Sequence, residues 1–383
     1  MTTPVLLVST GTRWIGTARF PAALARAGFE VALLGPRGSL AEKSRHVHKI
    51  GHLPDQASAA QWVFAFAAMV KAVAPAIVLP CDDMAFRLLA TLHTDPPAGM
   101  QPALHAELAR LIADSLGDPG YYLTSVDKLL LPPAAAALGV RVPAFTTVGS
   151  AAEAEPFIAD HGWPLIVKRS FSTAGSGVAI CSDRRALDAA CAEFLAPAPG
   201  DPPVARAPRV LLQAAIEGTR MYHCTLAWRG EVRVGWTAEV LVAHTPPMGT
   251  AAVSRQFHFP AMREEVARLA RGFGMHGVFG CEFMVEKGTG LPHLLEINRR
   301  VSPGFHRGAA FNVDLAAGLL AGLENRTSTS RARLDDGEEY SAVNFPQEWL
   351  RDPDSRYLRE RPVDVPWDDP DLIEAFLAMR HDR

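Results

Sequence analysis

Three oxygen-bearing side chains occur on two neighbouring strand-like runs, at residues 281–284 and 294–298. Side chains alternate along a strand, so Glu296 and Asn298 share one face, and a hairpin can bring Glu282 to the same side. Two carboxylates and an amide oxygen suit Mg²⁺, whose remaining ligands can be phosphate oxygens and water. The spacing of these residues therefore predicts a magnesium site on the hairpin.

A structural ion pair is the alternative for the same two glutamates. An acidic pair in an otherwise apolar hairpin is costly unless each carboxylate has a basic partner. Arg299 and Arg300 follow the second run directly and could supply these partners. Spacing alone leaves both interpretations open.

A lysine at the end of an apolar strand precedes a loop of small residues. Lys168 ends the strand-like run 164–168, and the loop extends from residue 170 to residue 177. The positive charge and the exposed backbone N–H groups of such a loop can bind a polyphosphate. The candidate loop residues are Ser172, Thr173, Gly175, Ser176 and Gly177. A solvated lysine on an edge strand, followed by a flexible hairpin, is the alternative.

Arginines before and after the acidic hairpin are candidates for binding a carboxylate substrate. Arg307 follows the hairpin and Arg255 precedes it. A guanidinium group binds a carboxylate through two parallel hydrogen bonds. Surface or structural arginines are the alternative. Ser302 and His306 lie near the same segment, and we expect His306 to form a hydrogen-bonding wall rather than to act as acid or base.

The N-terminal elements predict a parallel sheet. Apolar strand-like runs at residues 4–10 and 30–36 flank a helical pattern, and a third run at 76–83 follows an alanine-rich crossover. This third run ends at Asp82 and Asp83, where the strands of a parallel sheet face a ligand crevice. The acidic pair can equally cap a helix. The glycine loop at 11–16 matches neither phosphate-binding motif and is predicted to be a tight turn.

Later elements predict an antiparallel sheet with helices. Strand patterns recur from residue 210 to residue 298, interrupted by a helical pattern at 262–274. Earlier, Ser125, Val126 and Asp127 can cap a helix that Pro132 and Pro133 would then disturb. The proline-rich run 196–209 is predicted to be an exposed loop.

The composition limits the classes of function. The chain has 383 residues, 48% of them hydrophobic, and 38 basic residues against 41 acidic ones. We therefore expect a large core and no nucleic-acid surface. Five scattered cysteines argue against disulfides or a zinc site and favour buried thiols. Without a signal-like or membrane-length apolar run, we expect a cytoplasmic protein with no membrane partner.

An ordered series of motifs resembles the ATP-grasp enzymes. Six segments occur in the family's order between about residues 120 and 322, and the first 110 residues look like the preceding pre-ATP-grasp domain. The segments are Ser125-Val126-Asp127-Lys128, Leu138-Gly139-Val140-Arg141-Val142-Pro143, the strand ending at Lys168 with its glycine-rich loop, Val210-Leu211-Leu212-Gln213 with Glu217-Gly218, Glu282, and Glu296-Ile297-Asn298-Arg299-Arg300. The implied fold is α/β and α+β, a parallel-sheet pre-ATP-grasp domain followed by the two-part ATP-grasp fold.

The resemblance implies a role for each matched position. Lys128, Lys168 and the small-residue loop would contact the phosphates of ATP. The adenine would be held at the hinge by Gln213, Ala214, Ala215, Ile216 and Glu217. Glu282, Glu296 and Asn298 would bind one or two Mg²⁺, with Mn²⁺ as a substitute, and Arg300 would face the transferred phosphoryl group. Arg255 and Arg307 would help to steady the acyl phosphate and the substrate carboxylate.

The family chemistry implies an ATP-dependent ligase that joins a small carboxylate to an amine through an acyl phosphate. A synthetase that forms carboxyphosphate from bicarbonate and a non-catalytic ATP-binding regulator are the alternatives. Relatives also suggest a homodimer. One departure concerns nucleotide binding: an acidic residue commonly follows the hinge glycine, and this chain has Thr219-Arg220-Met221 there.

Four segments are expected from this resemblance. Residues 1–115 form the pre-ATP-grasp domain, and residues 116–212 form the linker helix and small subdomain. Residues 213–325 form the large subdomain with the metal site, and residues 326–383 form a C-terminal extension.

Overall fold

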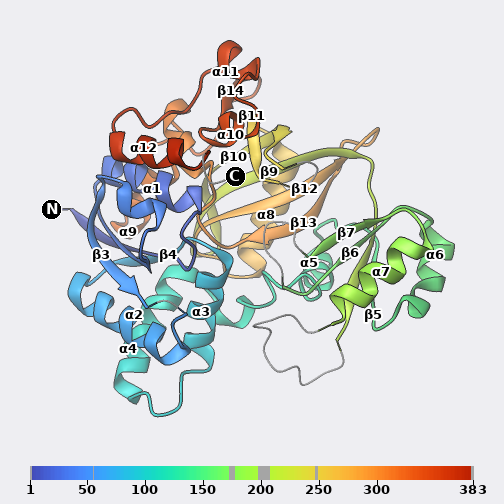
Figure 1. The fold of residues 1–383 in the computed structure, drawn as a ribbon, viewed down its shortest axis with the longest axis horizontal. Helices are drawn as coiled ribbons and strands as arrows, with labels where there is room; N and C mark the ends of the chain where they lie inside the picture. The colour runs from blue at the N-terminus through green and yellow to red at the C-terminus, as the bar shows by residue number, and fades with distance from the viewer. Residues whose placement is uncertain (1, 55, 172–176, 197–207, 246–248, 381–383) are drawn as a thin grey trace. The chain divides into compact units, whose positions relative to one another are not determined.

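The computed structural model describes residues 2–54, 56–171, 177–196, 208–245 and 249–380 (Figure 1). The chain divides into two compact units, described separately below. The first unit comprises Met1–Tyr122, Tyr222–Cys281 and Ile297–Arg383, and the second comprises Leu123–Met221 and Glu282–Glu296. Strands β9, β12 and β13 each pass from one unit to the other. The four segments expected from the sequence stay a prediction.

The first unit begins with a parallel sheet in the order β3-β2-β1-β4. Its strands are β1 (Thr3–Val8), β2 (Phe29–Pro36), β3 (Val47–Leu53) and β4 (Ile77–Pro80). The register places Val5 of β1 beside Val31 of β2 on one side and Ile77 of β4 on the other. All three side chains are fully buried, as expected for central parallel strands covered on both faces. The predicted parallel sheet is confirmed, while β3, a polar strand, was not expected.

Four helices accompany this sheet, and Figure 1 shows them in blue to cyan. They are α1 (Ile15–Ala27), α2 (Ala59–Val73), α3 (Asp83–Thr94) and α4 (Pro102–Leu116). Helix α2 begins with a reciprocal capping box between Ser58 and Gln61. Asp82 caps α3 by accepting a hydrogen bond from the backbone N–H of Ala85 at 2.8 Å. The helix-cap interpretation of Asp82 is therefore confirmed.

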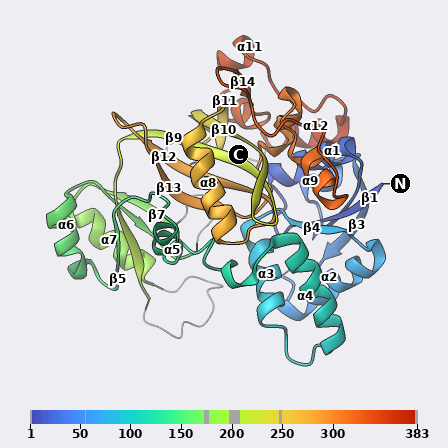
Figure 2. The same cartoon turned by 180° about the vertical axis from the view of Figure 1, so that it is seen from behind.

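A six-stranded sheet follows, in the order β13-β12-β9-β10-β11-β14. Its strands are β9 (Gly218–Trp228), β10 (Glu231–Ala243), β11 (Ala251–Phe257), β12 (Gly277–Glu286), β13 (Pro292–Asn298) and β14 (Glu339–Val343). Helix α8 (Pro260–Gly272) lies along this sheet, as both views show (Figures 1 and 2). Met262, Val266 and Leu269 form its fully buried stripe at helical spacing. The predicted strands at 221–228, 231–242, 278–286 and 291–298 and the helix at 262–274 are confirmed. Strand β11 was not expected, and the strand predicted from residue 210 belongs to a different sheet.

The remaining elements of the first unit are short helices. They are α9 (Leu315–Leu323), α10 (Gln347–Arg351), α11 (Tyr357–Glu360) and α12 (Pro370–Ala378), with the 3₁₀ helices η1 (Leu40–Lys43), η2 (Pro119–Tyr121) and η4 (Phe305–Phe311). Strand β14 pairs antiparallel with β11, so residues 326–383 complete the sheet edge. None of the helices in the described part of the chain is both long and apolar enough to cross a membrane.

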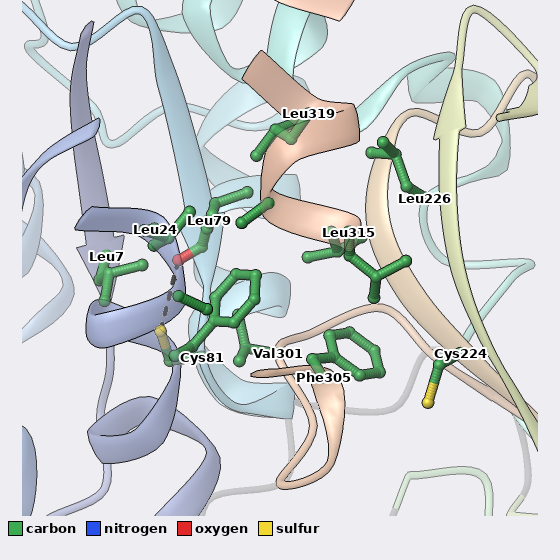
Figure 3. Close-up of a cluster of buried hydrophobic side chains, with 14 of the residues drawn as sticks. Leu7, Leu24, Leu79, Cys81, Cys224, Leu226, Val301, Phe305, Leu315 and Leu319 are labelled. Atoms are coloured by element: carbon green, nitrogen blue, oxygen red, sulfur yellow. Dashed lines mark hydrogen bonds between the residues drawn. The ribbon is translucent and has the colours of Figure 1, made fainter. Parts of the chain in front are cut away.

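One apolar core joins the elements of the first unit (Figure 3). Leu7 and Leu79 come from the parallel sheet, Leu226 from β9, and Leu315 and Leu319 from α9. Each of these side chains is at most 2% exposed. The core therefore fixes the ends of β1 and β4 against the antiparallel strands of the same unit. All five cysteines are buried free thiols, as predicted.

The second unit contains a four-stranded antiparallel sheet in the order β5-β8-β6-β7. Its elements are β5 (Phe145–Val148), β6 (Leu165–Lys168), β7 (Val178–Cys181) and β8 (Val210–Ala214), with α5 (Leu131–Ala137), η3 (Ala151–Ala154), α6 (Glu155–His161) and α7 (Arg184–Phe194). Val167, Leu187 and Leu212 are fully buried in its core.

Two predictions for the second unit have different outcomes. Pro132 and Pro133 were expected to disturb a helix, and this was wrong because α5 begins at Leu131, which puts both prolines in its first turn. Backbone N–H groups have no helical partner in the first turn, so proline is accepted there. Most of the proline-rich run, residues 197–207, lies outside the described residues.

Candidate functional site

Lys168 is a buried lysine at the end of an interior strand. Strand β6 lies between β8 and β7, and the Lys168 side chain is only 6% exposed. The alternative of a solvated lysine on an edge strand is therefore wrong. Its Nζ lies 3.4 Å from the Leu295 carbonyl oxygen. Burial lowers the pKa of Lys168 to about 8, with Lys128 adding to the effect and Glu296 and Glu282 opposing it.

The loop after Lys168 is partly described. Ser172, Thr173, Gly175 and Ser176 lie outside the described residues, and Gly177 is buried. The backbone N–H of Arg169 donates to the Gly177 carbonyl at 2.9 Å, so the two ends of the loop meet. The predicted phosphate-binding role of these residues stays a prediction.

Lys128 lies beside one of the two hairpin carboxylates. Its Nζ is 3.9 Å from Glu296 Oε2. The Lys128 backbone N–H donates to the Ser170 carbonyl at 3.0 Å, and the Ser170 hydroxyl donates to Asp127 Oδ2 at 2.6 Å. Asp127 also accepts from the Leu129 N–H at 2.7 Å. These bonds fix the backbone of Lys128 to the beginning of the small-residue loop.

Arg220 lies beside the other hairpin carboxylate. Its Nε is 3.4 Å from Glu282 Oε2, and the two side chains are 19% and 29% exposed. Lys128 and Arg220 thus provide cations within 4 Å of Glu296 and Glu282. The sequence pointed to Arg299 and Arg300 for this task.

Arg299 and Arg300 have other partners within the first unit. Arg299 is buried, donates to the Leu116 carbonyl, and lies 5.2 Å from the ring centre of Phe86. Burial lowers its pKa to about 10, and Tyr122 opposes this effect. Its surroundings are those of a structural residue in the core.

Arg300 is held by three oxygen atoms and an aromatic ring of the first unit. Its guanidinium donates to Asp83 Oδ1 at 3.1 Å, to Asn298 Oδ1 at 2.9 Å and to Ser302 Oγ at 3.1 Å. It also lies over the Trp14 ring, 4.5 Å from the ring centre. A guanidinium fixed in this way is pre-organised to bind an anion.

Gln213 occupies the predicted adenine position on β8. Its side chain is 1% exposed, and its register partners are Phe145 on β5 and Ile166 on β6. The buried Nε2 has no hydrogen-bond partner among the residues that the structure describes. Such an unsatisfied donor is costly in a folded protein, which is consistent with a donor kept for a ligand.

The rest of the predicted hinge follows β8. Ala214 and Ala215 donate backbone hydrogen bonds to the carbonyls of Ala144 and Pro164, at 2.9 and 3.4 Å. Ile216 is half-buried, and the Glu217 side chain is 79% exposed and pairs with Lys287 at 2.5 Å. These hinge residues stay predicted contacts of the nucleotide.

Arg255 and Arg307 differ in their surroundings. Arg255 lies on β11 and pairs with Glu239 at 2.6 Å and Glu339 at 3.1 Å. Hydrogen bonding to Glu239 raises its pKa further. These two carboxylates already neutralise Arg255, so it would have to leave one of them to bind a substrate. Its catalytic role stays a prediction.

Arg307 is buried, and its hydrogen-bond acceptors among the described residues are uncharged oxygen atoms. It donates to Asn344 Oδ1 at 2.8 Å, to Ser254 Oγ at 2.9 Å and to Gln256 Oε1 at 3.0 Å. His306, next to it, has Nε2 2.8 Å from Asp364 Oδ2. Burial lowers the pKa of His306 to about 4, which agrees with a neutral hydrogen-bonding side chain.

Two residues at these positions were not among the predicted site residues. Arg220 was noted only as a departure from an acidic position, and Trp14 lies in a loop interpreted as a plain turn. One feature of the sequence could have identified Arg220. It is a basic residue at a position where an acidic residue is common, and it belongs to the same series of motifs as Glu282 and Glu296.

The donor set fits a magnesium ion that arrives with a nucleotide. Among the described residues, no group of three or more His, Cys, Asp or Glu side chains could hold a metal ion by itself. Mg²⁺ commonly uses one or two protein carboxylates and takes its other ligands from phosphates and water. Glu282 and Glu296 meet this requirement, and the buried Lys168 fits a neighbouring polyphosphate.

Comparison with known proteins supports this interpretation. Residues 127–224 match the family model of the carbamoyl-phosphate synthase L chain ATP-binding domain. A curated relative, the carbamoyl phosphate synthase large chain of Saccharolobus islandicus, is 25% identical over 217 residues, covering 55% of this chain and 20% of the relative. The chain therefore spans about a fifth of the length of the curated relatives that it matches.

Solved structures show a similar fold. The L-amino acid ligase from Bacillus licheniformis has a TM-score of 0.56 at 16% identity, over 84% of this chain and 74% of the other. The biotin carboxylase domain dimer of Hydrogenobacter thermophilus 2-oxoglutarate carboxylase, in complex with MgADP and bicarbonate, has a TM-score of 0.63 at 16% identity, over 89% and 74%. The likeness to these solved structures is one of fold, and the predicted α/β and α+β fold class is confirmed.

Proposed function

Because this chain has the ATP-grasp fold, we propose that it is an ATP-dependent ligase that activates a small carboxylate and joins it to an amine. The observation that carries the proposal is the cluster around Lys168 in the second unit. A buried lysine, a second lysine and two carboxylates share this region, with Glu296 3.9 Å from Lys128. Phosphoryl transfer requires mainly positioned charges of this kind.

Lys128 and Lys168 would bind the phosphates of ATP. The loop residues up to Gly177 would close over them, and Gln213 would donate to the adenine. Glu282, Glu296 and Asn298 would hold Mg²⁺, or Mn²⁺ in its place, and the metal would neutralise phosphate charge. Because Lys168 is fixed by the surrounding sheet, its charge is in place before the nucleotide binds.

The proposed reaction has two steps. In the first, a carboxylate oxygen of the substrate attacks the γ-phosphorus of ATP, the bond to the β,γ-bridging oxygen breaks, and ADP leaves. In the second, an amine nitrogen attacks the acyl carbon, phosphate leaves, and the nitrogen loses a proton to solvent. Arg300 would stabilise the transferred phosphoryl group, and Arg307 and Arg255 would orient the carboxylate.

An ADP-release screen tests the proposal. The full chain is incubated with Mg²⁺-ATP and pools of carboxylates and amines, and products are identified by mass spectrometry. We expect ADP release only when both substrates are present, with an amide product of matching mass. The Glu296→Ala variant should lose this release. ADP release that depends on bicarbonate would favour a carboxyphosphate-forming synthetase, and ATP binding without turnover would favour a regulator.

Three further attributes belong to the proposal. We expect small-molecule substrates, a cytoplasmic location and a homodimer. Size-exclusion chromatography with light scattering tests the oligomeric state, for which a mass of twice 41.3 kDa is expected.

A further inference from the structure

Arg220 and Glu282 face each other across two neighbouring strands of the six-stranded sheet. Arg220 lies on β9 and Glu282 on β12, strands that are adjacent in the sheet order. The Arg220 Nε lies 3.4 Å from Glu282 Oε2. Both side chains are mostly buried, so water screens this ion pair less than it screens a pair on the surface.

The backbone near this pair is tightly fixed. Gly218 begins β9, and a side-chain carbon added to it would lie 2.1 Å from the Val285 carbonyl oxygen of β12. A residue larger than glycine therefore would not fit at position 218 without displacing the backbone. Because β9 and β12 are neighbours in the sheet, we expect Arg220 to leave Glu282 by moving its side chain.

Several cations of the second unit interact with the two hairpin carboxylates. Lys128 lies 3.9 Å from Glu296, Arg220 lies 3.4 Å from Glu282, and both carboxylates act on the pKa of Lys168. Cations gathered in this way attract a polyphosphate and repel a free divalent cation.

We propose that Arg220 occupies Glu282 in the empty protein and makes metal binding at Glu282 depend on the nucleotide. This inference rests on the proposed function, because it takes Glu282 as a metal ligand. A guanidinium and a metal ion compete for the same carboxylate oxygens. When the phosphates of ATP or ADP arrive, they give Arg220 a second anionic partner and release Glu282 to the metal.

This arrangement has a direct consequence for the order of binding. Free metal meets a carboxylate that is already paired, so it binds weakly on its own. Metal that arrives with a nucleotide finds both a free carboxylate and phosphate ligands. Arg220 is thus a positioning residue that couples the two binding events.

Manganese binding measures this coupling directly. Free Mn²⁺ is followed by electron paramagnetic resonance during titration of the full chain, without and with saturating ADP. The Arg220→Met variant should bind Mn²⁺ at least tenfold more tightly than wild type without ADP, and ADP should improve its affinity less. Arg220→Lys retains the charge and should resemble wild type. The matched control is Arg271→Met, which removes an exposed cation paired with Glu231 and should change nothing.

Each outcome decides one question. Equal Mn²⁺ affinity of wild type and Arg220→Met without ADP would overturn the coupling while leaving Glu282 as a metal ligand. If Glu282→Gln leaves Mn²⁺ binding with ADP unchanged, the metal role in the proposed function is wrong instead. Circular dichroism checks the fold of each variant, and Arg220→Gln serves as a second neutral variant if Arg220→Met fails to fold.

Discussion

Asp83 fixes the direction of Arg300: its Oδ1 accepts a hydrogen bond from the Arg300 Nε at 3.1 Å. The preceding residue, Asp82, caps α3 and also accepts from the Ser9 and Thr10 hydroxyls, each at 2.8 Å. The backbone that carries Asp83 is therefore rigid. Asp82 therefore caps helix α3, whereas Asp83 orients the Arg300 guanidinium.

Replacing Asp83 tests whether this orientation matters for the reaction. Asp83→Asn keeps the size of the side chain but weakens the hydrogen bond to the guanidinium. A hydrogen bond to a charged group contributes about 1.5–3 kcal/mol, so we expect kcat to fall by roughly tenfold or more. The KM for ATP should stay near the wild-type value, because the phosphate-binding lysines are untouched.

The matched control for this variant is Asp188→Asn. Asp188 also pairs with an arginine, Arg184, at 2.8 Å, but the pair lies on an exposed helix face. It should leave turnover unchanged. A normal kcat in Asp83→Asn would show that Arg300 needs no fixed orientation.

Lys168 can be tested for both binding and stability. Lys168→Met removes the charge and retains most of the apolar volume. We expect kcat/KM for ATP to fall by roughly two orders of magnitude, as when a single stabilising charge is removed from a transition state. Thermal stability should be equal or higher, because a buried charge is lost. Steady-state ADP release and differential scanning calorimetry measure the two effects, and near-normal turnover would contradict the assigned role.

The sequence identified the strands of the site because their pattern is local. Alternation along 281–284 and 294–298 agrees with the structure at Phe283 and Ile297, which are at most 5% exposed, whereas the Glu282 and Glu296 side chains are 29% and 32% exposed. It could not show which cation meets which carboxylate. Arg220 reaches Glu282 through the pairing of β9 with β12, and such long-range register has no sequence pattern of its own.

The same limit explains two other differences. The burial of Lys168 depends on β6 having a strand on each side, and the sequence does not give the strand order. Strand β14 joins β11 from almost ninety residues away, so residues 326–383 were expected only as an extension. Local residue preferences predict the helices and strands, whereas packing of the whole chain decides which strands pair within a sheet.

Gln213 gives a prediction in which binding and stability change in opposite directions. Its buried Nε2 has no hydrogen-bond partner among the described residues, and an unsatisfied donor costs about 1–3 kcal/mol. Gln213→Leu should therefore raise the free energy of unfolding by about 1 kcal/mol. If the donor serves the adenine, affinity for ADP should fall by roughly tenfold. Urea denaturation and isothermal titration calorimetry measure the two effects.

Gln347 provides a control for the same substitution. It is also buried, and its Oε1 has no partner among the described residues, but it lies on α10 in the first unit. Gln347→Leu should raise stability without changing ADP affinity. Equal ADP affinity in Gln213→Leu and wild type would remove Gln213 from the nucleotide site.

His306 makes the stability of the first unit depend on pH. Burial lowers its pKa to about 4, Arg19 adds to the effect, and the hydrogen bond with Asp364 opposes it. The unfolded side chain has a pKa of about 6.5, so below that pH the unfolded chain takes up a proton that the folded chain excludes. Stability is therefore lost as pH falls from about 6.5 towards 4, by about 2 kcal/mol at pH 5.

His306→Gln cannot titrate and should show a correspondingly smaller loss between pH 7 and pH 5 in urea denaturation. His48→Gln, at an exposed position, should follow wild type. Because other buried histidines contribute to the wild-type curve, the difference between wild type and His306→Gln isolates this residue. Parallel curves would show that folding does not change the pKa of His306.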